Sequence, residues 1–294
     1  MRNDISTQSV KNPEDIKVIA IIGAGTMGSG IAQVAAQAGF QTILYDVIPD
    51  ATEKGFETIK KNLAIAVEKK KISETEKEKI LSCIKLSNNF KDLVADVMIE
   101  VVVEKLEVKS ELFNKLASQN DDDTIFCTNT SSIPITKIAE SISHPERLVG
   151  MHFFNPAHLM KLVEIVSGAK TSYENAETIF FLAKKFGKEP VMARDAPGFI
   201  VNRIGKMYHT EPLKILEEKI ASVETIDMLL ESSGFKMGPF KLIDLIGVDA
   251  NLNVTKSLYE LFNHHPKFKP SDIQQQLVDT GFLGKKSGKG FYKY

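Results

Sequence analysis

The sequence contains little cysteine and no excess of charge of either sign. Its 294 residues include only two cysteines, Cys83 and Cys127, which form neither a CxxC pair nor a Cys/His cluster with zinc spacing. We therefore expect a reducing compartment and no metal site. Lys and Arg total 37 against 38 for Asp and Glu, a net charge of −1. This balance gives no electrostatic reason to expect a nucleic acid or an anionic membrane as partner.

A long hydrophobic run is also missing. Residues 18–45 carry no charge, but glycines and glutamines interrupt them, whereas a membrane-spanning helix needs about 20 predominantly apolar residues. The N-terminal residues have no apolar segment typical of a secretory signal, and they carry too many acids for a transit peptide. We interpret residues 1–15 as a flexible extension. The cytoplasm is the expected location, with the mitochondrial matrix as the alternative.

A strand–helix–strand unit begins after this extension. Residues 17–22 are a short β-branched run typical of a buried parallel strand, and a glycine cluster follows at once. Residues 29–38 have helical spacing, and residues 41–45 predict a second strand, so the segment is one βαβ unit. The alternation continues with strands expected at 97–103, 124–128, 148–153 and 162–166 and with helices expected at 105–117 and 176–186.

Two helical regions stand apart from this alternation. Residues 50–83 are lysine-rich and helical in pattern, and Ser73 with Glu76 predicts a capping box inside them. Past Pro197 only helical periodicity is evident until the last residues. The expected fold class is α/β. A Rossmann-type dinucleotide-binding domain over residues 16–200, with a helical insertion at about 50–83, precedes an all-helical C-terminal domain over residues 201–294.

Glycines in the turn after the first strand match a dinucleotide-binding motif. Gly23 permits a tight turn, Gly25 lets a pyrophosphate approach the backbone, and Gly28 allows the helix to pack closely on the sheet. The helix N-terminus then offers N–H groups and a positive dipole end to the phosphates. The candidate cofactor-binding residues of this turn are Gly23, Gly25, Thr26, Met27 and Gly28.

An acidic residue closes the second strand of the unit. Asp46 lies near the expected offset of about 20 residues from the motif. There its carboxylate can accept hydrogen bonds from a ribose 2′-hydroxyl and repel a 2′-phosphate. NAD is therefore the expected cofactor, in preference to NADP. FAD bound by the same motif, and a glycine turn that serves packing alone, stay as alternatives.

Oxidation of an alcohol by hydride transfer needs a base to remove the hydroxyl proton, and histidine suits this role near neutral pH. Among the six histidines, His152 lies at the end of an expected strand, whereas the others lie in expected loops or on a helix. From these residues alone a buried, hydrogen-bonded structural histidine is the commoner interpretation, and the catalytic one stays open.

Several further motifs follow one another in order. They are Asn129-Thr-Ser131-Ser132, His152-Phe-Phe-Asn155-Pro156, Met160-Lys-Leu-Val-Glu164, Asp195-Ala-Pro-Gly-Phe-Ile-Val-Asn202-Arg203, Met237-Gly-Pro-Phe240 and Lys286-Ser-Gly-Lys-Gly290-Phe-Tyr292. From about residue 16 to the last residue, the sequence strongly resembles the L-3-hydroxyacyl-CoA dehydrogenase family, which includes bacterial 3-hydroxybutyryl-CoA dehydrogenases.

The resemblance implies an oxidoreductase that uses NAD to oxidise (S)-3-hydroxyacyl-CoA to 3-oxoacyl-CoA. The reaction is reversible, the acyl chain is expected to be short, and the context is fatty-acid β-oxidation or butyrate metabolism. Residues 232–236 and 247–250 depart from the family pattern, which leaves acyl-chain length open. Two other readings remain: another NAD-dependent hydroxyacid dehydrogenase on the same fold, of the L-gulonate type, and a non-enzymatic NAD-binding protein.

The resemblance also assigns roles in the reaction. His152 matches the family's catalytic histidine, and Glu164 matches the carboxylate that pairs with it. Ser131 matches a serine that hydrogen-bonds the substrate near the reacting oxygen, and Asn202 matches an asparagine that holds the substrate from the second domain. Without the family, Ser131 would be read as a turn residue and Asn202 as a residue that makes a hydrogen bond within its helix.

Further ligand contacts follow from the resemblance alone. Glu104, Lys109, Asn155 and Lys286 match positions that contact NAD, as does Ser131. Asn62 and Lys69 in the lysine-rich insertion match positions that contact coenzyme A, again together with Ser131. A solvated surface charge is the alternative for Lys69 and Lys286. The implied partner is an acyl-CoA substrate, and the implied assembly is a homodimer through the C-terminal domain, where several helices have apolar faces.

Overall fold

The computed structural model describes residues 13–294. They divide into two compact units between Asp195 and Ala196, which are called here the first and the second unit. Within residues 13–294, no helix is both long and apolar enough to cross a bilayer.

The first unit is built on an eight-stranded sheet in the order β3-β2-β1-β4-β5-β6-β7-β8. All neighbouring strands are parallel except β6 and β7, which are antiparallel. The strands are β1 (Val18–Ile22), β2 (Gln41–Tyr45), β3 (Ile84–Ser87), β4 (Val97–Glu100), β5 (Ile125–Thr128), β6 (Leu148–Phe153), β7 (Leu162–Ser167) and β8 (Glu189–Arg194).

Apolar runs in the sequence predict the central strands of the sheet, but they do not predict the edge strands. β4, β5 and β6 are buried at every position, which is why continuous apolar runs predict them. β3 and β8 form the two edges and are half-exposed, so neither has such a run. β4 ends at Glu100, earlier than the run 97–103 suggests, because the Glu100 carboxylate accepts a hydrogen bond from Val102 N at 2.8 Å and the chain turns there.

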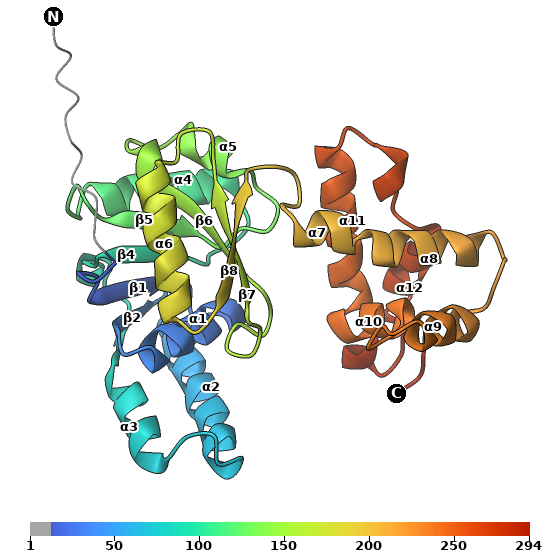
Figure 1. Cartoon of the computed structure of the whole chain (residues 1–294), viewed down its shortest axis with the longest axis horizontal. Helices are drawn as coiled ribbons and strands as arrows, with labels where there is room; N and C mark the ends of the chain where they lie inside the picture. The colour runs from blue at the N-terminus through green and yellow to red at the C-terminus, as the bar shows by residue number, and fades with distance from the viewer. Residues whose placement is uncertain (1–12) are drawn as a thin grey trace, which may run out of the picture. The chain divides into compact units, whose positions relative to one another are not determined.

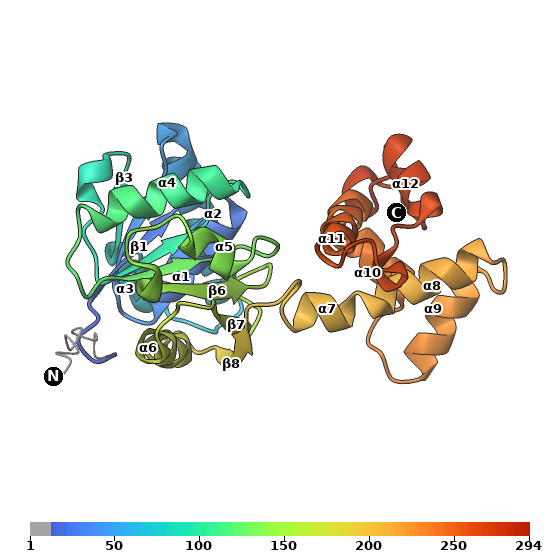
Figure 2. The same cartoon turned by 90° about the horizontal axis from the view of Figure 1, so that it is seen from above.

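Six helices surround the sheet or extend from it. They are α1 (Thr26–Gln37), α2 (Pro49–Glu68), α3 (Glu74–Ser82), α4 (Leu106–Ala117), α5 (Ile135–Ala139) and α6 (Tyr173–Lys185). In Figure 2, α4 and α5 lie on one face of the sheet and α6 on the other. α1 and α6 share one hydrophobic core, in which Phe40 and Phe186 meet edge to face. α2 and α3 form a hairpin that extends from the sheet (Figure 1), and the expected capping box of Ser73 and Glu76 begins α3.

The second unit is helical. Its helices are α7 (Val201–Gly205), α8 (Met207–Glu217), α9 (Val223–Ser232), α10 (Pro239–Ile246), α11 (Val248–Leu261) and α12 (Asp272–Asp279). A small apolar core around Phe240 and Ile243 joins α8, α9 and α10. Two buried acids on these helices hold the C-terminal segment: Asp244 accepts hydrogen bonds from the backbone of Phe291 and Tyr292, and Asp227 accepts one from the Tyr292 hydroxyl.

A polar cluster is buried in this unit beside α11. His209 Nδ1 lies 2.8 Å from the amide nitrogen of Asn251, and Lys206 Nζ donates to the Asn251 carbonyl at 3.0 Å. Since the Asn251 amide nitrogen can only donate, His209 Nδ1 must accept and cannot carry a proton. Burial, and secondarily the Lys206 charge, lower the pKa of His209 to about 3, and burial lowers the pKa of Lys206 to about 7.

We therefore expect acid to destabilise the second unit through His209. The pKa of an unfolded histidine is near 6.5, so between pH 6.5 and pH 3 the unfolded chain binds a proton that the folded chain excludes. This contribution to stability is present above pH 6.5 and falls as the pH is lowered, by about 3 kcal/mol between pH 7 and pH 4. Urea denaturation across this range should show a smaller loss for His209→Gln than for wild type. The exposed His264 provides the control His264→Gln, and equal slopes in all three proteins would contradict the assignment.

Candidate active site

A histidine and a glutamate face each other across the antiparallel pair β6–β7. His152 on β6 is paired in register with Glu164 on β7, and His152 Nδ1 lies 2.7 Å from Glu164 Oε2. His152 is 6% exposed and Glu164 is fully buried. Residues directly opposite in an antiparallel pair have neighbouring side chains, so the register of the two strands is enough to bring these residues together.

The contact determines which histidine nitrogen can accept a proton. The Glu164 carboxylate only accepts hydrogen bonds, so Nδ1 carries the proton in this contact and the basic lone pair is on Nε2. When Nε2 takes up a proton, the ring becomes a cation next to a buried anion, which stabilises it. Histidine with a carboxylate behind it is an arrangement suited to general acid–base chemistry.

A second glutamate holds the loop that follows β5. Glu104 Oε1 accepts hydrogen bonds from the backbone N–H groups of Ser131 and Ser132, both at 3.2 Å, and from the Ser132 hydroxyl at 2.8 Å. The Thr130 hydroxyl also donates to it. Burial alone would raise the pKa of Glu104, but the Lys109 charge and these hydrogen bonds lower it. Glu104 is thus an anion that orders the Ser131 loop.

A buried lysine links Glu104 to a glutamate beneath it. Lys109 on α4 is 1% exposed, and its ammonium lies 2.6 Å from Glu100 Oε1 and 3.2 Å from Glu104 Oε2. Glu100, fully buried at the end of β4, also accepts a hydrogen bond from the Thr128 hydroxyl at 2.7 Å. Lys109 therefore bridges two carboxylates from inside the protein.

The glycine turn has the geometry that a dinucleotide requires. A Cβ at Gly23 would lie 2.4 Å from the Val101 carbonyl oxygen, and one at Gly28 would lie 1.7 Å from the Gly23 oxygen, so neither position tolerates a side chain. Gly25 is different: nothing lies within 4 Å of its Cβ position, although it is the N-cap of α1. Packing of the described residues does not explain Gly25, whereas the approach of a phosphate would.

Asp46 is tied to the same turn. Its Oδ2 accepts a hydrogen bond from Ala24 N at 2.8 Å, and its Oδ1 accepts one from Ile48 N at 3.0 Å. The N-terminus of α1 has no side-chain cap and no acidic residue in its first turn, so its N–H groups and positive dipole end suit an anion. The residues at this turn fit the phosphates and a ribose of a dinucleotide.

The loop after β6 packs against the helix of the glycine turn. Asn155 is exposed at the start of this loop, and Lys188 donates to the carbonyls of Ala157 and Met160 at 2.6 and 2.8 Å. A Cβ at Gly30 on α1 would lie 3.1 Å from the Ala157 side chain. Lys188, which is 9% exposed, thereby fixes the loop that carries Asn155 beside α1.

One edge of the sheet collects most of the expected residues of the first unit. The glycine turn, the Glu104 segment, the Ser131 loop and His152 lie at the carboxyl ends of β1, β4, β5 and β6, which are neighbours in the sheet. Asn129 joins two of these ends, because its side-chain oxygen accepts a hydrogen bond from Phe153 N at 2.8 Å. The carboxyl edge of a parallel sheet is where ligands bind in open α/β folds.

The residues expected to contact coenzyme A lie elsewhere, on the α2–α3 hairpin. The Asn62 amide donates to Gln33 of α1 at 3.1 Å, and Lys69 is exposed at the end of α2. A pocket of about 360 Å³ opens between the two helices. It is lined by Lys60, Lys61, Ala64, Lys77, Glu78 and Leu81, so three lysines that the motifs did not single out lie on the hairpin that carries Asn62 and Lys69.

Two expected residues belong to the second unit. Asn202 lies on α7, is half-buried, and its side-chain amide makes no hydrogen bond within residues 13–294. Lys286 pairs with Asp249 at 2.6 Å, and this contact lowers the pKa of Asp249.

Sequence reasoning missed Glu100, Asn129, Thr130 and Lys188 as parts of the site. Glu100 had a visible signal, since it is a charge inside an otherwise apolar strand segment. Burial raises the pKa of the Cys127 thiol far above its usual range, so this cysteine is not suited to act as a nucleophile. Within residues 13–294, no cluster of three or more His, Cys, Asp or Glu side chains could hold a metal ion.

Comparison with known proteins matches both units. Residues 18–196 match the family model of the 3-hydroxyacyl-CoA dehydrogenase NAD-binding domain, and residues 198–294 match that of the C-terminal domain. The chain is 45% identical over 282 residues to a 3-hydroxyadipyl-CoA dehydrogenase of Escherichia coli, which covers 95% of this chain and 59% of that protein. The chain thus spans about three-fifths of the length of that relative.

Two further relatives match over nearly their whole length. A probable 3-hydroxybutyryl-CoA dehydrogenase of Bacillus subtilis is 42% identical, with 95% of this chain and 98% of that protein covered. The crystal structure of an (S)-3-hydroxybutyryl-CoA dehydrogenase from Ralstonia eutropha superposes with a TM-score of 0.90 at 37% identity, covering 95% of this chain and 99% of that one.

The role of Lys109 can be tested by its removal. Lys109→Met leaves the fully buried Glu100 carboxylate without its cation, and breaking a buried ion pair typically costs about 3–5 kcal/mol. We expect a loss of this size in the free energy of unfolding measured with urea, and partial recovery in Lys109→Met/Glu100→Gln. Lys115 on the same helix pairs with Glu111 at the surface, so Lys115→Met should change stability by less than about 1 kcal/mol. Equal losses for the two lysines would refute the buried-cation role.

Proposed function

The chain belongs to the 3-hydroxyacyl-CoA dehydrogenase family, and from this premise we propose that it oxidises short-chain (S)-3-hydroxyacyl-CoA thioesters reversibly to 3-oxoacyl-CoA. It is an NAD-dependent oxidoreductase. The observation that carries the proposal is the pairing of His152 with Glu164 at 2.7 Å, at the sheet edge that also carries the glycine turn. Such an activity belongs in fatty-acid β-oxidation or butyrate metabolism.

In this proposal His152 is the general base. NAD held at the turn from Gly23 to Gly28 would supply the acceptor for the hydride from C3 of the substrate. His152 Nε2 takes the hydroxyl proton, and Glu164 stabilises the imidazolium that results. In the reverse direction the same imidazolium returns the proton to the 3-oxo group. Ser131 and Asn202 hydrogen-bond the substrate, and holding it in the reactive geometry accounts for a large part of the rate enhancement.

The cofactor-binding residues of the proposal lie along the sheet edge. The turn from Gly23 to Gly28, including Thr26 and Met27, holds the pyrophosphate, and Asp46 holds a ribose. We assign Glu104, Ser131 and Asn155 to the nicotinamide half, and Lys286 to a contact from the C-terminal segment. Because its charge is buried, Lys109 supports this site by holding Glu104 and not by direct contact.

We assign coenzyme A to the α2–α3 hairpin. Asn62 and Lys69 are the residues taken from the family resemblance, and Lys60, Lys61 and Lys77 around the nearby pocket add positive charge. Lysines suit the phosphates of coenzyme A, each as a point charge on a flexible stem. A hydroxyacid without coenzyme A would make no use of the lysines of this hairpin, which favours a thioester substrate over the L-gulonate type.

We further propose a homodimer through the second unit. Its helices expose large apolar side chains, among them Met228 and Leu229 on α9 and Leu245 and Ile246 on α10, each 48–64% exposed. α9 and α10 pack against each other, so these side chains lie on neighbouring elements. Apolar surface of this extent on adjacent helices typically marks an interface, and two-fold dimers are the commonest assembly.

The names of the relatives differ in the acyl group. One is a 3-hydroxybutyryl-CoA dehydrogenase, whose substrate ends in a methyl group, and another is a 3-hydroxyadipyl-CoA dehydrogenase, whose substrate ends in a carboxylate. The chemistry at C3 is common to both.

The catalytic pair gives the decisive test. His152→Gln should lower kcat by about 10²–10⁴-fold, the usual contribution of a general acid–base group, while NAD affinity and stability stay near wild type. Glu164→Gln should also lower kcat, because it removes the charge that stabilises the imidazolium. The measurements are steady-state oxidation of (S)-3-hydroxybutyryl-CoA, NAD binding by fluorescence titration, and thermal unfolding. His144, whose side chain is 44% exposed, supplies the control His144→Gln.

A purely structural pair would behave differently. Both variants would then lose melting temperature and NAD affinity together. A well-folded His152→Gln protein with near-normal turnover would disprove the assignment of His152 as the base.

Cofactor choice tests Asp46. Repulsion of a 2′-phosphate by this carboxylate predicts that Asp46→Asn and Asp46→Ala both narrow the preference for NAD over NADP, by roughly tenfold or more in kcat/KM. Asp46→Asn can retain the hydrogen bond from Ala24 N, so it separates the charge from the support of the glycine turn. Asp50→Asn, an exposed change in the first turn of α2, is the control. A wild-type enzyme that uses both cofactors equally would exclude the role given to Asp46.

A further inference from the structure

The loop after β5 divides its polar groups into two sets. Glu104 Oε1 accepts hydrogen bonds from the Thr130 hydroxyl and from both the N–H and the hydroxyl of Ser132. Within residues 13–294, the Ser131 hydroxyl and the side-chain nitrogen of Asn129 donate to no acceptor. The loop therefore keeps two donors, one on Asn129 and one on Ser131, that Glu104 does not occupy.

One hydrogen bond fixes the orientation of the Asn129 amide. Phe153 N donates to its side-chain oxygen at 2.8 Å. Because a backbone N–H can only donate, the atom that faces Phe153 must be the oxygen, and the nitrogen takes the other place in the planar amide. The backbone of Asn129 is held as well, since its N–H donates to the Glu100 carbonyl at 3.0 Å. The side-chain nitrogen, with its two hydrogens, is thus held in place and left available to a ligand.

This nitrogen belongs to the part of the sheet edge that carries the candidate base. Asn129 follows β5 directly, Phe153 is the last residue of β6, and the two strands are neighbours. His152 precedes Phe153, so the residue that binds the Asn129 oxygen is next to the base in the chain. All of these residues belong to the first unit. A substrate oxygen that gives its proton to His152 Nε2 must lie at this edge, where the Asn129 and Ser131 donors are.

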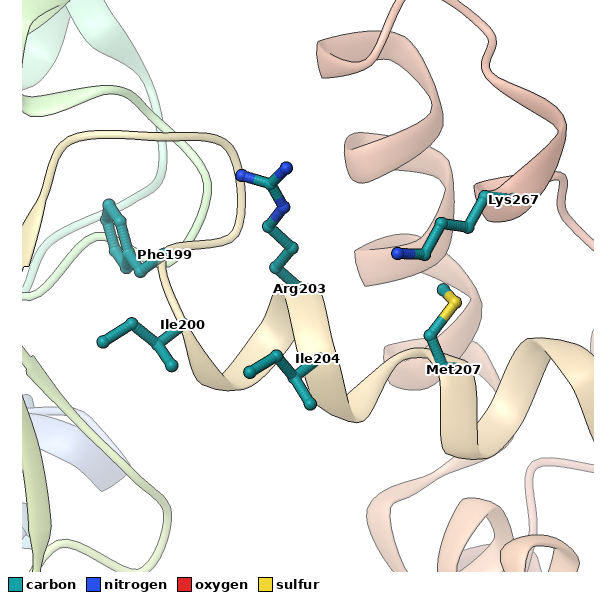
Figure 3. A pocket seen from close by; sticks show the side chains of 6 residues that line it. All are labelled: Phe199, Ile200, Arg203, Ile204, Met207 and Lys267. Atoms are coloured by element: carbon teal, nitrogen blue, oxygen red, sulfur yellow. The ribbon is translucent and has the colours of Figure 1, made fainter.

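The pocket of the second unit offers different chemistry to a ligand. It has a volume of about 420 Å³ and is lined by four apolar side chains and by Arg203 and Lys267 (Figure 3). Two cations suit an anion. The oxygen on C3 is neutral in the hydroxyacyl substrate and in the 3-oxo product, so a neutral N–H donor matches it in both. Asn129 supplies such a donor in the first unit.

We propose that Asn129 donates a hydrogen bond from its side-chain nitrogen to the oxygen on C3 of the substrate, and that it is thus a further catalytic residue. The inference rests on the proposed function and adds one residue to it. A hydroxyl that donates its proton to His152 has two lone pairs, so it can accept from Asn129 and Ser131 at the same time. As the proton leaves, negative charge develops on this oxygen, and donors that are already in position stabilise it.

Two ligands isolate the hydrogen bond to the C3 oxygen. Acetoacetyl-CoA carries this oxygen, whereas butyryl-CoA has the same chain length and the same thioester but no oxygen on C3. Neither is oxidised further at C3 in the presence of NAD, so both dissociation constants can be measured by titration calorimetry with NAD at saturation. Loss of one hydrogen bond should lower the preference for acetoacetyl-CoA over butyryl-CoA by about three- to tenfold.

Two variants separate donation from support of the strand. In Asn129→Asp a carboxylate can still accept the hydrogen bond from Phe153 N, but it has no N–H to donate. We expect this variant to keep a melting temperature near wild type and to lower kcat for (S)-3-hydroxybutyryl-CoA by about 10²-fold. Asn129→Ala removes the donor without adding charge, so the loss of ligand preference should appear in both variants. Asn253 is exposed on α11, and Asn253→Asp is the control that should change neither quantity.

The outcomes separate this inference from the proposed function. If wild type oxidises (S)-3-hydroxybutyryl-CoA and both Asn129 variants keep the ligand preference, the inference is wrong and the proposed function stands. Equal weakening of the two ligands would also overturn it, because Asn129 would then act only by shaping the loop. Absence of turnover by wild type would overturn the proposed function, and the role of Asn129 with it.

Discussion

Two fully buried carboxylates, Glu100 and Glu164, impose the main constraint on the first unit. An ionised carboxylate loses several kcal/mol of hydration when it is buried, so each one requires a cation or donors at close range. Glu164 has His152 opposite it on the neighbouring strand, and Glu100 has Lys109 from α4. The side chains that meet these demands are thereby held in place, and they support the chemistry.

The two pairs differ in what they leave available for function. Lys109 is enclosed, and through Glu104 it orders the Ser131 loop without facing a ligand. His152 is the residue before the last one of β6, where the strand reaches the ligand-binding edge of the sheet. The same physical requirement, a partner for a buried anion, therefore produces a scaffold at one strand and a candidate base at another.

The buried charged side chains of the second unit have a different kind of partner. Its buried acids Asp227 and Asp244 receive backbone and tyrosine donors from the C-terminal segment, and its buried histidine is kept neutral. By contrast, the Arg203 guanidinium and the Lys267 ammonium lie over the rings of Phe262 and Phe268, and neither pairs with a carboxylate in the part of the chain that the structure describes. The buried acids of this unit therefore have hydrogen-bond donors within it, whereas these two cations have no acidic partner among the described residues.

The sequence alone determined the features that depend on neighbouring residues. Spacing predicts the βαβ unit with its glycine turn and Asp46, apolar runs predict the central strands, and Ser73 with Glu76 predicts the cap of α3. Such patterns act within a few residues, so no knowledge of the fold is needed to read them. The family motifs extended this to His152, Glu164 and Asn202, but as resemblance and not as physical derivation.

Only the tertiary structure decided the features that depend on strand register and on the edges of the sheet. The antiparallel register that sets His152 opposite Glu164 joins two strands whose relative offset no local pattern specifies. The half-exposed edge strands β3 and β8 have no apolar run to mark them. Glu100 with Lys109, and Arg203 with Phe262, become pairs only when helices and loops pack, because the side chains that meet come from different elements. Local sequence determines which helices and strands form, whereas long-range packing determines which charged side chains lie together.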